Sequence, residues 1–191
     1  LQAAREQAQR AEQKIGLLRN ELDQLGKMVH ADALTGAVNQ CGLNEAFARE
    51  AARADRRNTP LCIALLDLDD FKWLNDTHGQ HAGDIALQYI VNIARETLRS
   101  NDIIARVGGE EFAVLLPDTG MELAVAVISR LQRNLAPGPF LQAGRQQPIT
   151  FSAGIASRAH NEKQSTLAHR ADTALYEAKR AGKNRVAAAP L

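Results

Sequence analysis

A run of apolar residues that ends in acids lies near the middle of the first half of the chain: Leu61-Cys62-Ile63-Ala64-Leu65-Leu66-Asp67-Leu68-Asp69-Asp70. The run is apolar without alternation and follows a proline, which predicts a strand over 60–67 that is buried on both faces. A carboxylate at the end of a buried strand is a common ligand for a hard cation, and Mg²⁺ prefers one or two carboxylates together with substrate phosphates. The alternative is a solvated turn whose acid caps the following helix.

A second feature lies downstream, where two short apolar runs flank Gly108-Gly109-Glu110-Glu111. The runs 103–107 and 112–116 predict two strands, and the glycine pair predicts a hairpin turn between them. Two glycines permit positive φ angles and a close approach of the backbone to a ligand, although a plain turn needs no function. In a βαββαβ sheet the first strand and this hairpin can be neighbours, which would bring Asp67 near Glu110. Two carboxylates around one metal ion suit nucleotidyl transfer, in which ions hold the attacking and leaving oxygens.

The rest of the chain supplies the other elements of such a sheet. Helical periodicity predicts helices over about 42–57, 83–99, 124–135 and 167–178, and two further strands are predicted over 149–155 and 186–189. The segment 136–148 is predicted to be a loop because it is rich in glycine and proline. The order predicts an α+β fold, a ferredoxin-like βαββαβ palm with a central antiparallel hairpin.

Residues 1–30 differ from the domain predicted over 31–191. Apolar residues there alternate spacings of four and three without a break: Ala4, Ala8, Ala11, Ile15, Leu18, Leu22, Leu25 and Val29. This heptad seam predicts a long helix that forms a parallel two-stranded coiled coil, and hence a homodimer. The alternative is a single amphipathic helix that packs on its own domain.

Composition limits the classes of function. The chain has 191 residues, with 23 Lys and Arg against 22 Asp and Glu, so its formal charge of +1 gives no case for binding polymeric nucleic acid. Apolar runs fall short of the roughly 18 residues needed to span a bilayer. The separated Cys41 and Cys62 form neither a disulfide framework nor a zinc knuckle, which favours a reducing, cytoplasmic location. Because the chain starts at Leu1 without Met or a signal peptide, we expect a fragment of a longer protein.

A polar, glycine-containing segment lies between apolar elements: Asn75-Asp76-Thr77-His78-Gly79-Gln80-His81-Ala82-Gly83-Asp84. An Asp can accept hydrogen bonds from the N1–H and N2–H₂ groups of guanine, which adenine does not offer. The alternative is loop capping. The chain has no P-loop, no dinucleotide fingerprint, no nucleophile elbow and no His/Cys spacing that fits zinc.

Five motifs in order resemble the diguanylate cyclase family. The segment 106–112 (Arg-Val-Gly-Gly-Glu-Glu-Phe) matches its GGDEF/GGEEF signature, and Asp32-Ala33-Leu34-Thr35-Gly36 resembles its D-x-L-T-G motif. The segment from Asp67 to Asp76 resembles D-x-D-x-F-K-x-x-N-D. The segments 170–179 and 182–184 resemble the closing helix and the residues after it, so the similarity covers about 30–187.

The resemblance implies a nucleotidyl-cyclase palm that condenses two GTP into cyclic di-GMP with loss of two pyrophosphates, as a dimer with one GTP per protomer. Asp67, the backbone carbonyl of Leu68 and Glu110 would hold Mg²⁺ (or Mn²⁺). Glu110 is implied as the base region for the 3′-hydroxyl, with Glu111 beside it. The remaining contacts to GTP are implied for Phe71, Lys72, Gly108, Gly109, Lys179 and Lys183 around the triphosphate and for Asn75 and Asp84 at guanine.

A further element, Arg99-Ser100-Asn101-Asp102, ends with five residues between Asp102 and Gly108 and matches the family's R-x-x-D inhibitory product site. Arg offers a fork for phosphate or for the Hoogsteen edge of guanine. The alternative is an ordinary helix C-terminus with a favourable Arg.

The chain departs from the family pattern at three positions. Gln80 stands where a His is usual, Gln40 where an Arg follows Asn39, and Lys183 where an Arg is frequent. None removes a metal ligand, so we expect activity, with the affinity for substrate in question. Two other functions stay open: a catalytically silent module that binds GTP or cyclic di-GMP, and an ATP-using nucleotidyltransferase. An upstream sensor, which could be membrane-bound, is expected to control the domain.

Overall fold

The computed structural model describes residues 14–15, 30–142 and 145–190. The heptad seam predicted over 1–30 therefore lies almost wholly outside the described residues. Within the described part, no helix is long and apolar enough to cross a membrane.

A five-stranded sheet forms the centre of the domain, with the strand order β2-β3-β1-β6-β7. Its strands are β1 (Leu61–Leu68), β2 (Ile103–Arg106), β3 (Glu111–Pro117), β6 (Phe151–Ser157) and β7 (Val186–Ala188). The central β1 pairs antiparallel with both β3 and β6, whereas β6 and β7 are parallel. The register places Asp67 opposite Glu111. This confirms the predicted palm and the predicted neighbourhood of the first strand and the hairpin.

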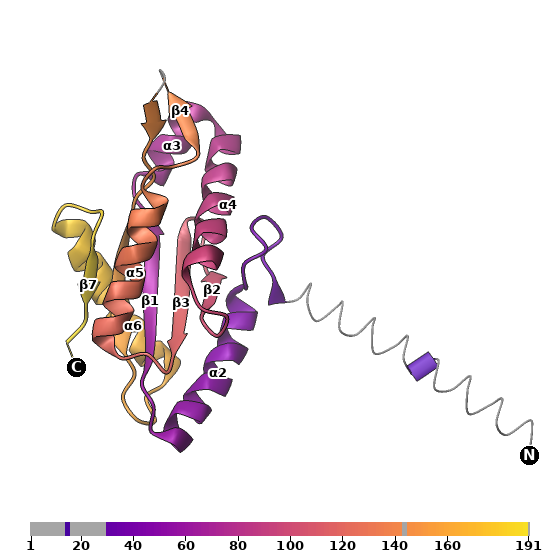
Figure 1. Cartoon of the computed structure of the whole chain (residues 1–191), viewed down its shortest axis with the longest axis vertical. Coiled ribbons are helices and arrows are strands. Elements are labelled where there is room, and N and C mark those ends of the chain that lie inside the picture. The colour runs from indigo at the N-terminus through magenta and orange to yellow at the C-terminus, as the bar shows by residue number, and fades with distance from the viewer. Residues whose placement is uncertain (1–13, 16–29, 143–144, 191) are drawn as a thin grey trace, which may run out of the picture.

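Helices cover both faces of the sheet (Figure 1). The helices α4 (Gln80–Thr97) and α5 (Met121–Leu135) pack on one face, and α2 (Gln40–Arg57) and α6 (Gln164–Arg180) pack on the other. Alternate residues of β1 belong to the two cores, Cys62 to the first and Ile63 to the second. The strand is apolar throughout because both of its faces are buried.

Two helices meet within the polar segment 75–84, of which the sequence predicted only the second. The helix α3 (Phe71–His78) begins directly after β1, and α4 begins at Gln80 rather than at 83. Asp70 adopts a left-handed backbone with φ of 55°, which turns the chain sharply from strand to helix. Gly79, with φ of 85°, separates the two helices, a conformation that glycine adopts without strain.

The segment 136–148, predicted to be a loop, contains a small antiparallel pair. Its strands are β4 (Phe140–Gln142) and β5 (Arg145–Gln147), and Figure 1 shows β4 at the same end of the domain as α3. The strand predicted over 149–155 runs two residues later, as β6. Three-residue strands are too short to show the alternation by which strands are recognised.

Candidate active site

The carboxylate of Asp67 lies at the end of β1 and is paired with a cation from α6. Its side chain is 10% exposed, and the Nζ of Lys179 is 2.7 Å from its Oδ2. The sheet face that carries Asp67 is the face on which α6 packs, which explains how a lysine more than a hundred positions away reaches it. A nearly buried carboxylate needs such a partner, because a charge without one is costly inside a protein.

Glu110 stands at the hairpin tip beside this pair. The Leu68 N–H donates to the Glu110 carbonyl oxygen at 3.2 Å, which ties the tip to the end of β1. Burial and the negative charge of Asp67 raise the pKa of the Glu110 carboxyl, although Lys179 acts in the opposite direction. Two carboxylates held close enough to repel each other are a donor set that fits a hard divalent cation such as Mg²⁺.

The glycines of the hairpin do not adopt the positive φ angles that the sequence suggested. A Cβ at Gly108 would lie 2.2 Å from the Oε2 of Glu111 and 3.1 Å from its Cβ. A Cβ at Gly109 would meet nothing within 4 Å. The exposed Glu111 side chain therefore lies next to Gly108, whereas Gly109 faces open space.

Arg106 holds the hairpin tip in place, a role that the sequence analysis missed. Its guanidinium donates to the carbonyl oxygens of Gly108, at 3.2 Å, and Gly109, at 2.7 Å. Its Nη1 is also 3.3 Å from both carboxylate oxygens of Asp32. The sequence feature that could have indicated this role is the position of Arg106 as the first residue of the segment 106–112.

The D-x-L-T-G motif supports this tip. The Asp32 Oδ1 accepts hydrogen bonds from the Thr35 N–H at 2.9 Å and from its hydroxyl at 2.6 Å. Burial acts to raise the pKa of Asp32, but these bonds together with Arg106 hold that pKa below its usual range. The motif therefore presents an ionised carboxylate to Arg106.

The start of α3 is a site where phosphate oxygens could bind. The first N–H groups of a helix lack partners within the helix and carry a partial positive charge. Lys72 is exposed in the first turn, and the Nζ of Lys183 is 2.6 Å from the Asp70 Oδ1, an interaction that raises the pKa of Lys183. The structure thus brings Lys72, Lys179 and Lys183 to the same end of the sheet as Asp67.

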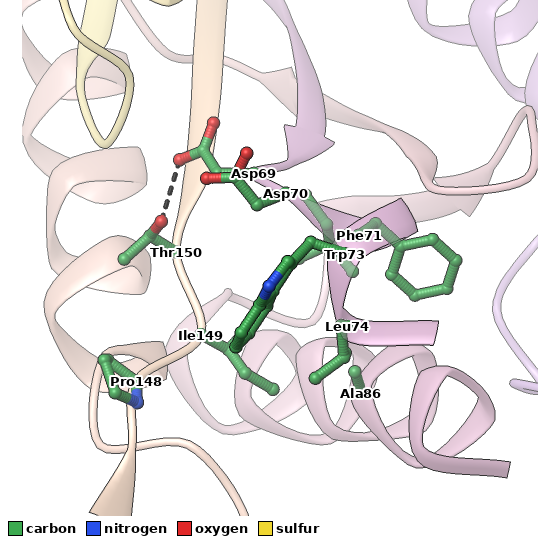
Figure 2. A pocket seen from close by; sticks show the side chains of 10 residues that line it. Asp69, Asp70, Phe71, Trp73, Leu74, Ala86, Pro148, Ile149 and Thr150 are labelled. Carbon is green, nitrogen blue, oxygen red and sulfur yellow. Dashed lines mark hydrogen bonds between the residues drawn. The ribbon is translucent and has the colours of Figure 1, made fainter. Parts of the chain in front are cut away.

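Asp69 anchors the end of β1, a second role that the sequence analysis missed. Its carboxylate accepts hydrogen bonds from the Thr150 and Ser152 hydroxyls, at 2.9 and 2.7 Å, and from the Asn184 N–H at 3.0 Å. Figure 2 shows the bond to Thr150 beside a pocket of about 470 Å³. Trp73 and Ile149 line this pocket, whereas Asn75 and Asp84, the residues implied for guanine, do not.

Asn75 and Asp84 lie on the two helices that meet at Gly79, α3 and α4. The Asn75 Oδ1 is buried without a hydrogen-bond partner, and it faces the α-carbon of Gly83, where a Cβ would lie only 2.0 Å away. Asp84 is half-buried and follows Gly83 directly. An acceptor without a partner beside a carboxylate is suited to bind the N–H groups of a purine.

Arg99 and Asp102 lie in the turn before β2, at the opposite end of that strand from the hairpin tip. The Asp102 Oδ2 accepts the Arg99 N–H at 2.9 Å, so this carboxylate already has a local structural role. Burial raises the pKa of Asp102. The Arg99 side chain is exposed and accessible to a ligand.

Comparisons with known proteins show which family the chain belongs to. The family described as "Diguanylate cyclase, GGDEF domain" matches residues 29–185, and the chain belongs to this family. It is 41% identical over 186 residues to diguanylate cyclase DgcP of Pseudomonas aeruginosa, and the matched region covers 97% of this chain but only 28% of DgcP. The chain therefore spans well under two thirds of the length of curated relatives such as DgcP.

Two solved structures have the same fold. The coiled coil and GGDEF domain of DgcB from Caulobacter crescentus, in complex with c-di-GMP, aligns with a TM-score of 0.86 and 30% identity over 94% of this chain and 95% of that one. The active GGEEF domain of a diguanylate cyclase from Vibrio cholerae aligns with a TM-score of 0.75 and 32% identity, over 80% and 97% of the two chains.

Proposed function

We propose that this domain condenses two GTP molecules into cyclic di-GMP and releases two pyrophosphates. The observation that carries the proposal is the Asp67–Glu110 carboxylate pair beside the start of α3 and its lysines. Family membership supports the same reaction.

Each residue of the site has a part in this reaction. Asp67, the Leu68 carbonyl and Glu110 would hold Mg²⁺ or Mn²⁺, which supplies charge to neutralise the phosphates and the 3′-oxygen. The amides at Phe71 and Lys72, with the lysine side chains, bind the triphosphate. Asn75 and Asp84 bind guanine, and their hydrogen bonds distinguish it from adenine.

The chemical step joins two protomers that face each other. Each 3′-oxygen forms a bond to the α-phosphorus of the other GTP, the bond from that phosphorus to the oxygen bridging to the β-phosphate breaks, and pyrophosphate leaves. Glu110 accepts the 3′-hydroxyl proton, with Glu111 beside it. Most of the acceleration comes from positioning and electrostatics.

The test is incubation of the protein with GTP and Mg²⁺, followed by chromatography of the products. Glu110→Gln should abolish formation of cyclic di-GMP and keep the circular dichroism spectrum of the folded protein. Glu122→Gln, at an exposed position in the first turn of α5, is the matched control and should keep activity. Product formation by Glu110→Gln at the wild-type rate would refute the assigned role. ATP in place of GTP should give no product, and absence of product from wild type at high concentration would favour a silent binding module.

Product inhibition through Arg99 and Asp102 is part of the proposal. Arg99→Ala should leave the initial rate unchanged and raise the cyclic di-GMP concentration needed for half-inhibition at least about tenfold, the effect of one lost charged hydrogen bond. Arg57→Ala, also an exposed Arg beside a helix end, is the control and should not shift the inhibition curve. An unchanged curve for Arg99→Ala would contradict the site.

The organisation around the domain is also proposed. Residues 1–30 would pair two protomers as a coiled coil, and residues 31–191 would form the catalytic unit. The pair would respond to an upstream sensor in a longer, cytoplasmic or membrane-attached protein, because relatives such as DgcP are several times longer than the matched region.

A further inference from the structure

Three side chains with metal-binding atoms lie together at the beginning of the domain, away from the carboxylates at the hairpin tip. The ligand atoms of His30, Cys41 and Glu45 are all within 4.8 Å of one another, and the His30 Nε2 is 3.2 Å from the Glu45 Oε1. Cys41 and Glu45 are exposed, and His30 is half-buried. The proposed reaction uses none of the three.

The backbone fixes this cluster. Cys41 and Glu45 are one turn apart on α2, so their side chains share a face. His30 is brought to that face by the Asn39 N–H, which donates to the His30 carbonyl oxygen at 2.8 Å. The segment between them is closed by an antiparallel bridge from Ala31 to Val38.

Gly42 makes the close approach possible. A Cβ at this position would lie 2.9 Å from the His30 carbonyl oxygen and 3.1 Å from the His30 Cβ. The helix turn that carries Cys41 can therefore contact the His30 backbone directly. The three side chains are held together by main-chain geometry and not only by their own attraction.

The ligand set identifies the class of ion. Imidazole, thiolate and carboxylate together are ligands of Zn²⁺ and similar transition-metal ions, whereas Mg²⁺ prefers oxygen ligands alone. A tetrahedral ion with bonds of about 2.0–2.3 Å separates its ligand atoms by about 3.3–3.8 Å, so small rotations of exposed side chains would complete the geometry. We propose that His30, Cys41 and Glu45 bind a thiophilic divalent transition-metal ion, with a fourth position open to water or another ligand.

This site could not be predicted from the sequence, because ten residues separate His30 from Cys41 and three separate Cys41 from Glu45, a spacing that matches no zinc motif. An ion bound at this site would also cross-link residue 30, where the predicted coiled coil meets the domain, to the first two turns of α2.

The experiment uses Zn²⁺ as the probe and the alkylation rate of Cys41 as the readout. The protein, in excess Mg²⁺, is treated with iodoacetamide over a range of Zn²⁺ concentrations, and modified peptides are measured by mass spectrometry. Cys62 is fully buried and should stay unmodified, so its alkylation would report unfolding of the domain. At a Zn²⁺ concentration ten times Kd, the Cys41 rate should fall about elevenfold, and a chelator should restore it.

Variants separate this site from simple ion pairing. His30→Gln and Glu45→Gln should each raise the Zn²⁺ concentration needed for protection by about tenfold or more, since even outer-shell partners cost that much. His160→Gln is the matched control and should keep the wild-type zinc protection of Cys41. His160 pairs with Asp55 at 3.2 Å, as His30 does with Glu45, but His160 is not part of the proposed site. In Glu110→Gln, Zn²⁺ should protect Cys41 as it does in wild type, which would show that the hairpin site is not the source of the protection.

Cobalt gives an independent readout. Co²⁺ should produce a thiolate-to-metal charge-transfer band in wild type and Cys62→Ala, and no such band in Cys41→Ser. Absence of zinc protection in wild type, or equal protection in wild type and His30→Gln, would overturn the proposal. Neither readout depends on cyclase activity, so failure of the proposed function would leave this test valid.

Discussion

The α-carbon of Gly83 faces the side-chain amide of Asn75 where α3 packs against α4. A Cβ there would lie 2.0 Å from the Asn75 Oδ1 and 3.0 Å from a ring carbon of Phe71. Both atoms are the far ends of side chains, so Gly83→Ala should fold and rotate Asn75 away from its position. If Asn75 binds guanine, loss of about one hydrogen bond should raise KM for GTP about tenfold with a smaller effect on kcat. Steady-state kinetics measures this change.

Gly120→Ala provides the matched control for this substitution. Gly120 has an ordinary φ of −77°, and a Cβ there would meet nothing within 4 Å. Its KM should equal that of wild type. A normal KM in Gly83→Ala, with unchanged thermal stability, would mean that Asn75 does not contact the base.

Individual residues differ in how far the sequence predicts them. Asp67 and Glu110 could be brought together from the apolar run, the hairpin signal and the topology, without any structure. The side-chain pairs that hold the site in place could not be predicted in this way. Asp32 and Arg106 are 74 positions apart in the sequence, and Asp69 and Ser152 are 83 positions apart. Such partners are decided by the folded sheet, and no local pattern indicates them.

At the scale of elements, the contact between α6 and β6 decides where Lys179 lies. A Cβ at Gly154 would lie 2.1 Å from the Ala171 carbonyl oxygen and 2.2 Å from the Leu175 nitrogen. These are backbone atoms that cannot rotate away, so Gly154→Ala must push the helix off the strand. It should lower the free energy of unfolding by about 3 kcal/mol, measured by urea denaturation, whereas Gly120→Ala should change it by less than about 1 kcal/mol.

The same substitution should also weaken the site. Since α6 carries Lys179 to the Asp67 carboxylate, displacement of the helix lengthens that 2.7 Å pair. Gly154→Ala should therefore reduce kcat even under conditions where it is fully folded. Wild-type stability and activity together would show that the helix accommodates the methyl group and that this contact does not set the site.

Elements with long periodic patterns could be predicted from the sequence, and short ones could not. The helix predicted over 124–135 lies within α5, and the predicted strand 60–67 is β1 within one residue. The eight-residue α3 has a single buried residue, Leu74, so it has almost no apolar face for a pattern to show. Its start depends on the left-handed turn at Asp70, which the local sequence does not specify.

At the scale of the whole molecule, the near-zero net charge does not show how charged side chains are arranged locally. The formal charge is +1, yet Lys179 and Lys183 both lie on carboxylates at one end of the sheet. A nucleotide needs only a few local charges and a metal ion, unlike a long nucleic acid, whose affinity depends on many phosphate contacts. The net charge therefore bears on binding of a polymer and does not bear on binding of a nucleotide.

The proposed reaction needs two domains, because each holds one GTP and the two 3′-hydroxyls attack across the pair. Tethering by a coiled coil over 1–30 would replace a collision in dilute solution by an effective concentration in the millimolar range. Deletion of residues 1–28 should therefore lower specific activity at least about 100-fold at micromolar protein. The activity of the deleted protein should rise with its concentration, because second-order pairing becomes limiting.

Sedimentation and rate measurements over the same concentration range test this dependence. A leucine-zipper dimer fused in place of residues 1–28 should restore activity at low concentration, at least in one of several registers, if pairing is what the segment provides. Full activity of the deleted protein at low concentration, with monomers in sedimentation, would show that the heptad seam is not the pairing element. In that case the seam's other interpretation, a single helix that packs on its own domain, would be favoured, and the surfaces that pair the two GTP sites would have to lie within residues 31–191.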